Sequence, residues 1–139
     1  MKVITETIPV STKGNADIID ITGQARERLD KSGLSDGMVH FFVSGSTAAI
    51  TTTEYEPGLI EDLPEALERI APSGSDYHHD ATWGDGNGHS HVRASFLGPG
   101  LGVPFANGRM ALGTWQQIIV IDMDNRSRKR EIIMQMMGI

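Results

Sequence analysis

The residue types that support catalysis or metal binding gather in residues 84–96, where a glycine-rich run leads directly to two histidines. His89 and His91 are two positions apart, and Arg93 follows at the same interval. If the second half of this stretch is a strand, these three side chains lie on one face, because side chains alternate between the two faces of a strand. With a rise of about 3.3 Å per residue, the two imidazoles start about 7 Å apart, and their rings can converge on one ion or substrate group.

Further metal ligands must be nitrogen or oxygen atoms, because the chain contains no cysteine. Neutral imidazoles bind zinc and similar ions strongly, and a catalytic site needs about three protein ligands and one open position. The third ligand can come from His79, Glu54 or Asp85, and a remaining carboxylate can act as a general base or orient a ligand imidazole. Four of the five histidines fall between positions 78 and 91. This concentration favours a site, and a hydrated surface loop is the alternative.

The glycines of the run Gly84–Gly88 permit two interpretations. They can bring backbone amides close to a phosphate, but the run has neither the GxGxxG pattern after a strand nor the lysine of a P-loop. A tight turn with positive φ angles is therefore the favoured interpretation.

Composition limits the class of protein. The 139 residues predict one domain, residues 1–139, with a core of its own. A net charge of −6 and a pI near 5.2 argue against nucleic acid as a partner. No apolar run approaches the roughly 18 residues of a membrane span, and the first residues lack the apolar centre of a signal peptide, so we expect no membrane partner and a cytoplasmic location. One basic cluster, residues 126–130, is interpreted as a solvated turn, with an anion-binding patch as the alternative.

The pattern of apolar residues predicts an α+β fold, largely an antiparallel sheet or sandwich with two main helices. Strands are expected at residues 3–10, 38–43, 48–55, 90–97, 103–105, 115–123 and 130–137, and Asn107-Gly108 is a strong hairpin signal. Helices are expected at residues 22–30, with Thr22 as a possible cap and Gly33 as the stop, and at 59–71, with Pro64 in the first turn. Residues 72–88 show no periodicity, and a loop of that length is typical of function or disorder.

The segment Gly113–Ile118, preceded by Asn107–Leu112, resembles the signature of the secondary thiamine-phosphate synthase family, also called the YjbQ family. The resemblance covers nearly the whole chain. It takes in Ser46–Ile50, the region from His79 to His91, Ala94-Ser95 with Gly98-Pro99, and the final strands.

This resemblance implies a YjbQ-like fold that assembles as a homotrimer with polar pockets near the subunit boundaries. The family's polar positions match Glu54, His79, Asp85, Asn87, His91 and Gln116, with His89 and Arg93 as neighbours. One position departs from the pattern. Many members carry a histidine where this chain has Gly45, so one ligand or proton carrier is missing, and His78 or His89 is a candidate to replace it.

The function expected from these residues is a metal-dependent transferase or hydrolase with a His/carboxylate site. His79, His89 and His91 would hold a divalent metal, with Zn²⁺ as the leading candidate, and Glu54 or Asp85 would serve as the base. Asn87 and Gln116 would position a small-molecule substrate, with a phosphorylated molecule as one candidate, and Arg93 is the one arginine expected in the site. The resemblance implies thiamine-phosphate synthesis as a weak activity, with the physiological substrate open. The alternative is a non-catalytic module that binds a small anion or phosphorylated metabolite in the same pockets.

Overall fold

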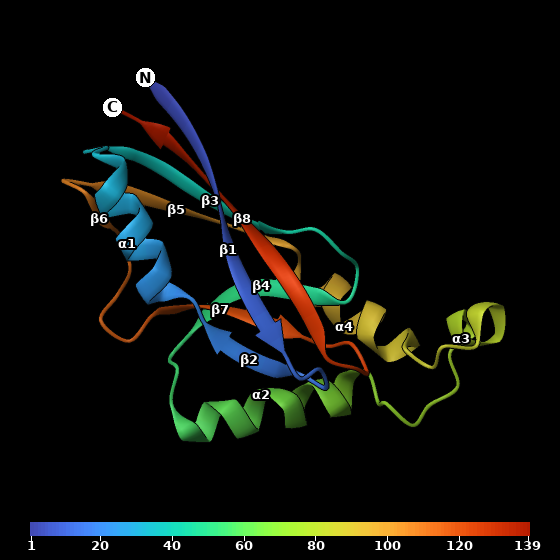
Figure 1. Cartoon of the computed structure of the whole chain (residues 1–139). Helices are drawn as coiled ribbons and strands as arrows, with labels where there is room; N and C mark the ends of the chain where they lie inside the picture. The colour runs from blue at the N-terminus through green and yellow to red at the C-terminus, as the bar shows by residue number, and fades with distance from the viewer.

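The computed structural model describes all residues from 1 to 139, as eight strands and four helices (Figure 1). In chain order these are β1 (Lys2–Thr12), β2 (Asp17–Asp20), α1 (Thr22–Ser32), β3 (Gly37–Val43), β4 (Ala48–Thr53), α2 (Pro57–Ile70), α3 (His78–Trp83), α4 (Gly88–Leu97), β5 (Gly100–Ala106), β6 (Arg109–Met110), β7 (Gln117–Asp122) and β8 (Arg128–Gly138). The expected α+β class is confirmed.

The strands form two antiparallel sheets. The larger sheet has the order β1-β8-β3-β5-β6 and the smaller one β2-β7-β4. The longest ladder joins β1 and β8 from the pair Lys2 and Gly138 to the pair Thr12 and Arg128, so the two ends of the chain lie side by side in Figure 1. Asn107 and Gly108 form the predicted hairpin, in which Phe105 pairs with Met110.

The main core lies between the two sheets and is closed by α1. It contains 18 buried apolar residues, among them Ala25 and Leu29 of α1 and Phe41 of β3. These residues come from alternate positions of β1, β3 and β8, because only one face of the larger sheet is buried there. The opposite face of the larger sheet carries no helix.

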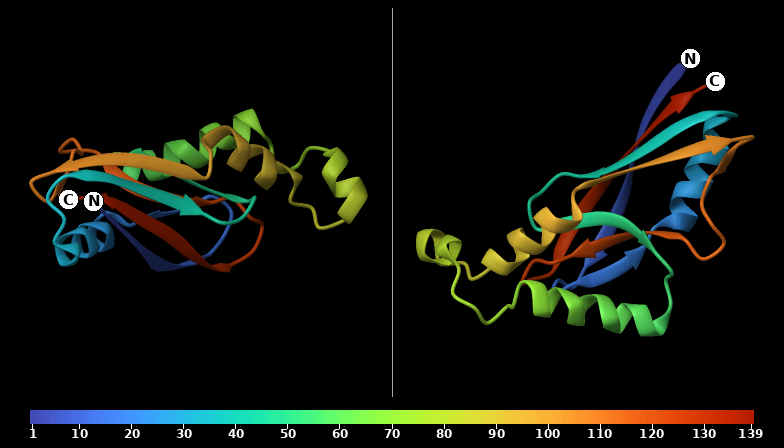
Figure 2. Two further views of the ribbon diagram at one scale, coloured as in Figure 1. Left: turned by 90° about the horizontal axis from the view of Figure 1, so that it is seen from above. Right: turned by 180° about the vertical axis from the view of Figure 1, so that it is seen from behind.

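A second apolar cluster lies behind the smaller sheet, under α2 and α4. Leu67 of α2 and Ala94 of α4 pack there against Ile119 and Ile121 of β7. Seen from above, α2 and α4 lie on one side of the strands and α1 on the other (Figure 2). The smaller sheet is therefore covered on both faces, which explains why the continuous apolar run 118–121 of β7 is fully buried.

The two expected helices are present, but the details of their N-termini differ from the predictions. Thr22 does not cap α1, because its hydroxyl accepts a hydrogen bond from the Ile118 amide of β7. Gly33 does end this helix, with a φ of 70°. Helix α2 begins at Pro57, and Glu56 caps it by accepting bonds from the next amides, so Pro64 lies inside the helix and not in its first turn.

Two further helices, α3 and α4, replace segments expected as loop and strand. Residues 88–97 are helical, so the predicted strand at 90–97 was wrong. The buried residues of α4 are Gly88, His89, Ser90, Arg93 and Ala94. Their spacing is helical, but three of them are polar, so no apolar stripe marks the helix in the sequence.

The basic cluster at residues 126–130 is not a solvated turn as a whole. Arg128 and Arg130 belong to β8 and form ion pairs with Asp124 and Asp122, whose side chains are almost fully buried. Only Arg126 and Lys129 are exposed as expected.

None of the helices is long and apolar enough to cross a lipid bilayer.

Candidate functional site

The candidate site is built where α3 and α4 meet. The predicted tight turn is present between them, since Gly84 and Gly86 have φ angles of 70° and 68°. Gly88 is required for a different reason: a Cβ atom there would lie 2.5 Å from Cβ of Tyr77, at the start of α3. The turn holds α3 beyond the end of α4, where it projects from the body of the molecule (Figures 1 and 2).

His79, Asp85 and Asn87 form one hydrogen-bonded group in this turn. Nε2 of His79 lies 3.5 Å from Oδ1 of Asp85 and 3.1 Å from the side-chain oxygen of Asn87. With the Asn87 amide turned over, its nitrogen donates to Asp85 at 3.1 Å and to His79 Nε2 at 3.1 Å. Asn87 is 7% exposed and therefore holds the half-buried imidazole and the exposed carboxylate in fixed relation.

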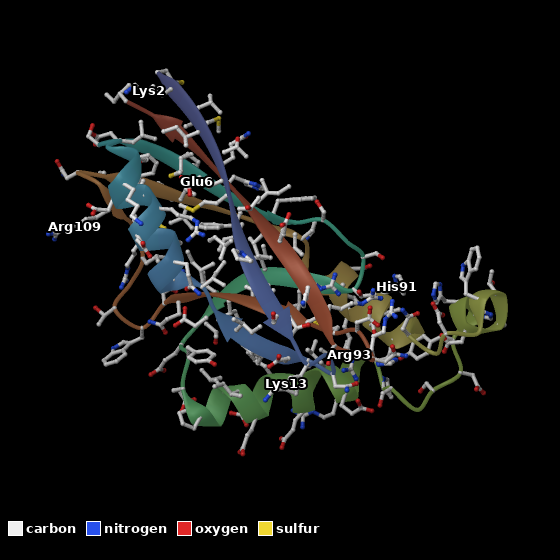
Figure 3. The ribbon with its side chains drawn as sticks, viewed as in Figure 1. Lys2, Glu6, Lys13, His91, Arg93 and Arg109 are labelled. Atoms are coloured by element: carbon white, nitrogen blue, oxygen red, sulfur yellow. The ribbon has the colours of Figure 1, made fainter.

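His91 joins this group from α4. Its ring lies 4.3 Å from the ring of His79, centroid to centroid, with an angle of 51° between the planes. Figure 3 shows His91 on the side of α4 that faces α3. His91 also lines a hollow of about 190 Å³, whose other walls are formed by the β3–β4 turn and the end of α4: Gly45, Ser46, Ala48, Ala94, Ser95 and Pro99.

This arrangement can move a proton and bind a small polar group. A carboxylate beside an imidazole fixes its orientation, and a second imidazole in contact can exchange a proton with it or with a ligand. The hollow beside His91 offers two serine side chains as hydrogen-bonding partners.

The same group fits a metal ion only in part. His79 and His91 are the imidazoles that would hold it, and Asp85 lies beside one of them. The single chain brings together no cluster of three or more His, Asp or Glu side chains arranged for a metal. A third ligand would have to come from a rearranged Asp85, from the substrate or from another copy of the chain.

His89 and Arg93 do not lie with His91, as the predicted strand required. In the helix they are four positions apart and both are buried, at 5% and 4% exposure. Arg93 donates from Nε to the Ala71 carbonyl and from Nη2 to Glu68 of α2. Figure 3 shows Arg93 beside the end of that helix. It thus fastens α4 to α2.

The ring of His89 packs beside Tyr77, with 6.3 Å between centroids, and its Nδ1 has no hydrogen-bond partner in the chain. Burial, and then the positive charge of Arg93, lower the pKa of His89 below its ordinary value. His89 is therefore a neutral imidazole near neutral pH.

Glu54 and Gln116 lie at the opposite end of β4 from His91. Glu54 follows the last residue of the strand, and Gln116 donates to the Thr52 hydroxyl at 3.1 Å. Ala48, the first residue of β4, lines the hollow next to His91. Five residues of extended strand separate these ends by about 17 Å. One chain therefore assembles His79, Asp85, Asn87 and His91 and leaves Glu54 and Gln116 apart.

Ser46 and Ser95 line the hollow but were not among the residues expected in the site. Ser46 lies within the Ser46–Ile50 segment that carried the family resemblance, which was the available signal. Ser95 carried the same signal, because Ala94-Ser95 is another of the stretches that support the resemblance.

Fold and site together define an α+β protein with two curled antiparallel sheets and a histidine–carboxylate cluster on a projecting helical edge. The family model described as "UPF0047 protein YjbQ-like" matches residues 6–139, and the chain belongs to this family. The resemblance to the YjbQ family is thereby confirmed.

Relatives and solved structures agree with this assignment over nearly the full length. The chain is 38% identical over 130 residues to a UPF0047 protein of Methanothermobacter thermautotrophicus, covering 94% of this chain and 90% of the relative. It is 35% identical over 126 residues to a UPF0047 protein of Archaeoglobus fulgidus, covering 91% and 96%. A YbjQ-like protein of unknown function from Sulfolobus solfataricus superposes with a TM-score of 0.94, at 34% identity and 99% coverage of both chains. A hypothetical protein from Aeropyrum pernix superposes with a TM-score of 0.91 at 31% identity, covering 98% of this chain and 99% of the other.

Proposed function

We propose that this protein is an enzyme whose active centre is the cluster of His79, His91 and Asp85. The observation that carries the proposal is the contact of the two imidazoles, 4.3 Å between centroids, with a carboxylate 3.5 Å from one of them. Two acceptor nitrogens and a carboxylate at the rim of a hollow are the parts needed for acid–base work on a small substrate.

In this proposal each residue has one task. Asp85 and Asn87 orient His79, and His79 supports the charge of His91 as it gains a proton. His91 faces the hollow and exchanges that proton with the substrate. Ser46 and Ser95, on opposite walls, hold the substrate's polar groups. A divalent cation, with Zn²⁺ as the first candidate, would supply Lewis-acid activation when bound by His79 and His91.

The first reaction to test is thiamine-phosphate synthesis, in which a pyrimidine methyl diphosphate joins a thiazole phosphate. A new bond forms between the thiazole nitrogen and the methylene carbon, the carbon–oxygen bond to the diphosphate breaks, and pyrophosphate leaves. His91 would donate a hydrogen bond or proton to the departing oxygen. We propose this as a weak activity of a site that has another physiological substrate.

The test compares His91→Ala with the control His78→Ala. His78 is the exposed first residue of α3, next to His79 in the sequence, and its side chain forms no hydrogen bond. Product formation is measured by chromatography, with and without added Zn²⁺, Mn²⁺ or Mg²⁺, and the metal content of untagged protein is determined by elemental analysis. We expect His91→Ala to lower kcat/KM about 100-fold or more, as for other general acid–base residues. Equal activity in both variants would refute the proposal, and ligand binding without turnover in the parent would favour the non-catalytic module.

We also propose that the protein works as a homotrimer, and the supporting observation is the uncovered face of the larger sheet. Val3, Met137, Met38 and Pro104 stand in register across four neighbouring strands. Val3, Met38 and Met137 are 60%, 41% and 38% exposed. An apolar row of this kind on a sheet face is typical of a subunit interface.

Assembly would also complete the site by placing Glu54 and Gln116 of one copy near His91 of the next. Light scattering on the eluted protein should give three times the chain mass. Met137→Lys should shift the mass toward one chain, whereas Lys31→Gln on α1 should not. A monomeric parent would refute the assembly.

A further inference from the structure

We propose that Arg130 is a substrate-binding residue of the His91 hollow, where its Nη1 holds the carboxylate or phosphoryl group of a small substrate. The inference rests on the proposed function, because it assigns a negatively charged group to the substrate of the same hollow. Gly45 connects the two features. It lines the hollow, and a Cβ atom built on it would lie 2.9 Å from Nη1 of Arg130. The arginine expected in the site, Arg93, is instead bound to α2.

The place of Arg130 follows from the register of β8. Side chains alternate along this strand, so Arg130 shares its inner face with the buried Ile132. Ile132 pairs with Val43, the last residue of β3, and the same register continued by two residues brings Gly45 of the β3–β4 turn opposite Arg130. Figure 1 shows this turn beside α4, the helix that carries His91. Strand pairing therefore directs the guanidinium toward the turn that forms one wall of the hollow.

The guanidinium of Arg130 is fixed before any ligand binds. Its side chain is 10% exposed, and Nε and Nη2 donate to the fully buried carboxylate of Asp122, while Nη2 also donates to the Thr47 hydroxyl at 2.8 Å. Thr47 is itself held, since its hydroxyl donates to Asp124 and its carbonyl accepts from the Met123 amide. Nη1 forms no hydrogen bond within the chain and is not cut off from solvent. A guanidinium held on two nitrogens with the third open is preorganised for an oxyanion.

Gly45 keeps the space in front of Nη1 free. Its φ of 144° lies in a region that residues with a side chain rarely adopt. A methyl group at this position would lie against Nη1 and cover it, because the two atoms would be only 2.9 Å apart. A glycine in such a place is typical of a backbone that a ligand approaches closely.

The lining of the hollow suits an anion. It contains no aspartate or glutamate, and Ser46 and His91 can both donate hydrogen bonds into it. Ser95 gives its own hydrogen to the His91 carbonyl at 2.7 Å and is left as an acceptor. Asp122 offsets the charge of Arg130, so Nη1 contributes a directed hydrogen bond more than a free charge. The volume of about 190 Å³ admits one carboxylate or phosphoryl group with few further atoms, which restricts the ligand to a small molecule.

The test is an NMR titration of the isotope-labelled full chain with acetate, with inorganic phosphate and with acetamide. The amide signals of Gly45 and Ser46 report binding in the hollow. Both anions should shift these signals, and acetamide, a neutral molecule of nearly the same shape as acetate, should bind at least about tenfold more weakly. The anion that binds more tightly identifies the charged group that the substrate carries.

Two variants isolate the contribution of Nη1. Arg130→Lys keeps a positive charge beside Asp122 and removes Nη1, whereas Gly45→Ala keeps the ion pair and covers Nη1 with a methyl group. Each should weaken the preferred anion about tenfold, as expected for one hydrogen bond between charged groups, and leave acetamide unchanged. The matched control Arg128→Lys makes the same change two positions away on the same face of β8, and Gly108→Ala reproduces the backbone strain at a φ of 71°. Both controls should bind the anion as the parent does.

The outcomes keep this site apart from the proposed enzymatic activity, because the titration requires no turnover. A chain without turnover that binds the anion as described would refute the enzyme and leave the Arg130 site standing. Loss of binding in His91→Ala but not in Arg130→Lys would place the anion on His91 and overturn the assignment. Equal weakening by Arg130→Lys and Arg128→Lys, equal affinity for acetate and acetamide, or no anion binding by the parent would do the same. Gly45→Ala decides the question if Arg130→Lys does not fold.

Discussion

The buried ion pair between Asp122 and Arg130 ties the smaller sheet to the larger one, and its loss is expected to be costly. Asp122 is fully buried and accepts hydrogen bonds from Arg130 Nε at 2.6 Å, Arg130 Nη2 at 3.0 Å and the Thr12 hydroxyl at 2.6 Å. Asp122→Asn keeps the shape of the side chain and removes its charge. The guanidinium then stays buried with only Asp124, 4.0 Å away, as a counter-charge.

Removing one partner of a buried pair costs about 3–5 kcal/mol. Because Asp124 remains near, we expect the lower end, about 3 kcal/mol, which corresponds to a fall in Tm of about 10 °C for a chain of this size. This loss is smaller than a total stability of about 5–15 kcal/mol, so Asp122→Asn should still fold.

Urea unfolding at a fixed protein concentration measures this change. Circular dichroism is the better signal, because Trp83 and Trp115 are 73% and 72% exposed and report little on the core. The double variant Asp122→Leu with Arg130→Met removes both charges and should be more stable than Asp122→Asn. A cost of less than about 1 kcal/mol for Asp122→Asn would refute the view that this pair holds the sheets together.

Three shorter predictions follow from other positions. The pKa of His89 is lowered in the folded chain, so the unfolded chain binds this proton more readily. The free energy of unfolding should therefore fall as the pH drops below about 6.5, by at most about 1.4 kcal/mol per pH unit. His89→Gln should flatten this part of a plot of the urea midpoint against pH. Gly108→Ala should cost about 1 kcal/mol in urea unfolding, because its φ is 71°, whereas Gly23→Ala, inside α1 with nothing within 4 Å of the added methyl, should stabilise by about 0.5–1 kcal/mol. Arg93→Lys should lower the free energy of unfolding by about 1–2 kcal/mol, since an ammonium cannot reproduce both hydrogen bonds of the guanidinium. An unchanged Tm in thermal unfolding would contradict the role of Arg93 as the link between α4 and α2.

The sequence predicts most of the elements whose buried residues are apolar, although the short strand β2, which buries Ile18, was not expected. The alternation in β3 and β8, the stripe of Ala25 and Leu29 in α1 and the stop at Gly33 all follow from which side chains must leave water. Asn107-Gly108 predicts its hairpin because both residues adopt positive φ angles, of 50° and 71°. The family resemblance added the fold as a whole.

Helices α3 and α4 could not be predicted from periodicity, for opposite reasons. No residue of α3 is buried, so nothing constrains the pattern of its side chains. The buried side of α4 is formed largely by His89, Ser90 and Arg93. Arg93 forms its hydrogen bonds with Glu68 and Ala71, which are more than 20 positions away in the sequence. A polar buried face can be recognised only when its partners are known, and those partners lie on α2 and near Tyr77.

The structure brings together four of the eight residues predicted for the site, His79, Asp85, Asn87 and His91, and leaves the other four apart. His79, Asp85 and His91 do come together, although the reason given, a strand with alternating faces, was wrong. The placement of Glu54 and Gln116 at the other end of β4 depends on strand pairing between β4 and β7, which local residue spacing does not encode.

The position of β8 between β1 and β3 has a consequence for folding during synthesis. Both neighbours are made long before β8, and β1 must wait for partners such as Gly138, 136 positions after Lys2. Neither strand can complete its place in the larger sheet until β8 has been translated, so their apolar faces and open edges stay exposed meanwhile. Such distant pairings slow folding and favour aggregation of the nascent chain. Substitutions in β8 to charged or polar residues delay its pairing with β1 and β3. They should therefore reduce the yield of folded protein in cells even where they change the free energy of unfolding little.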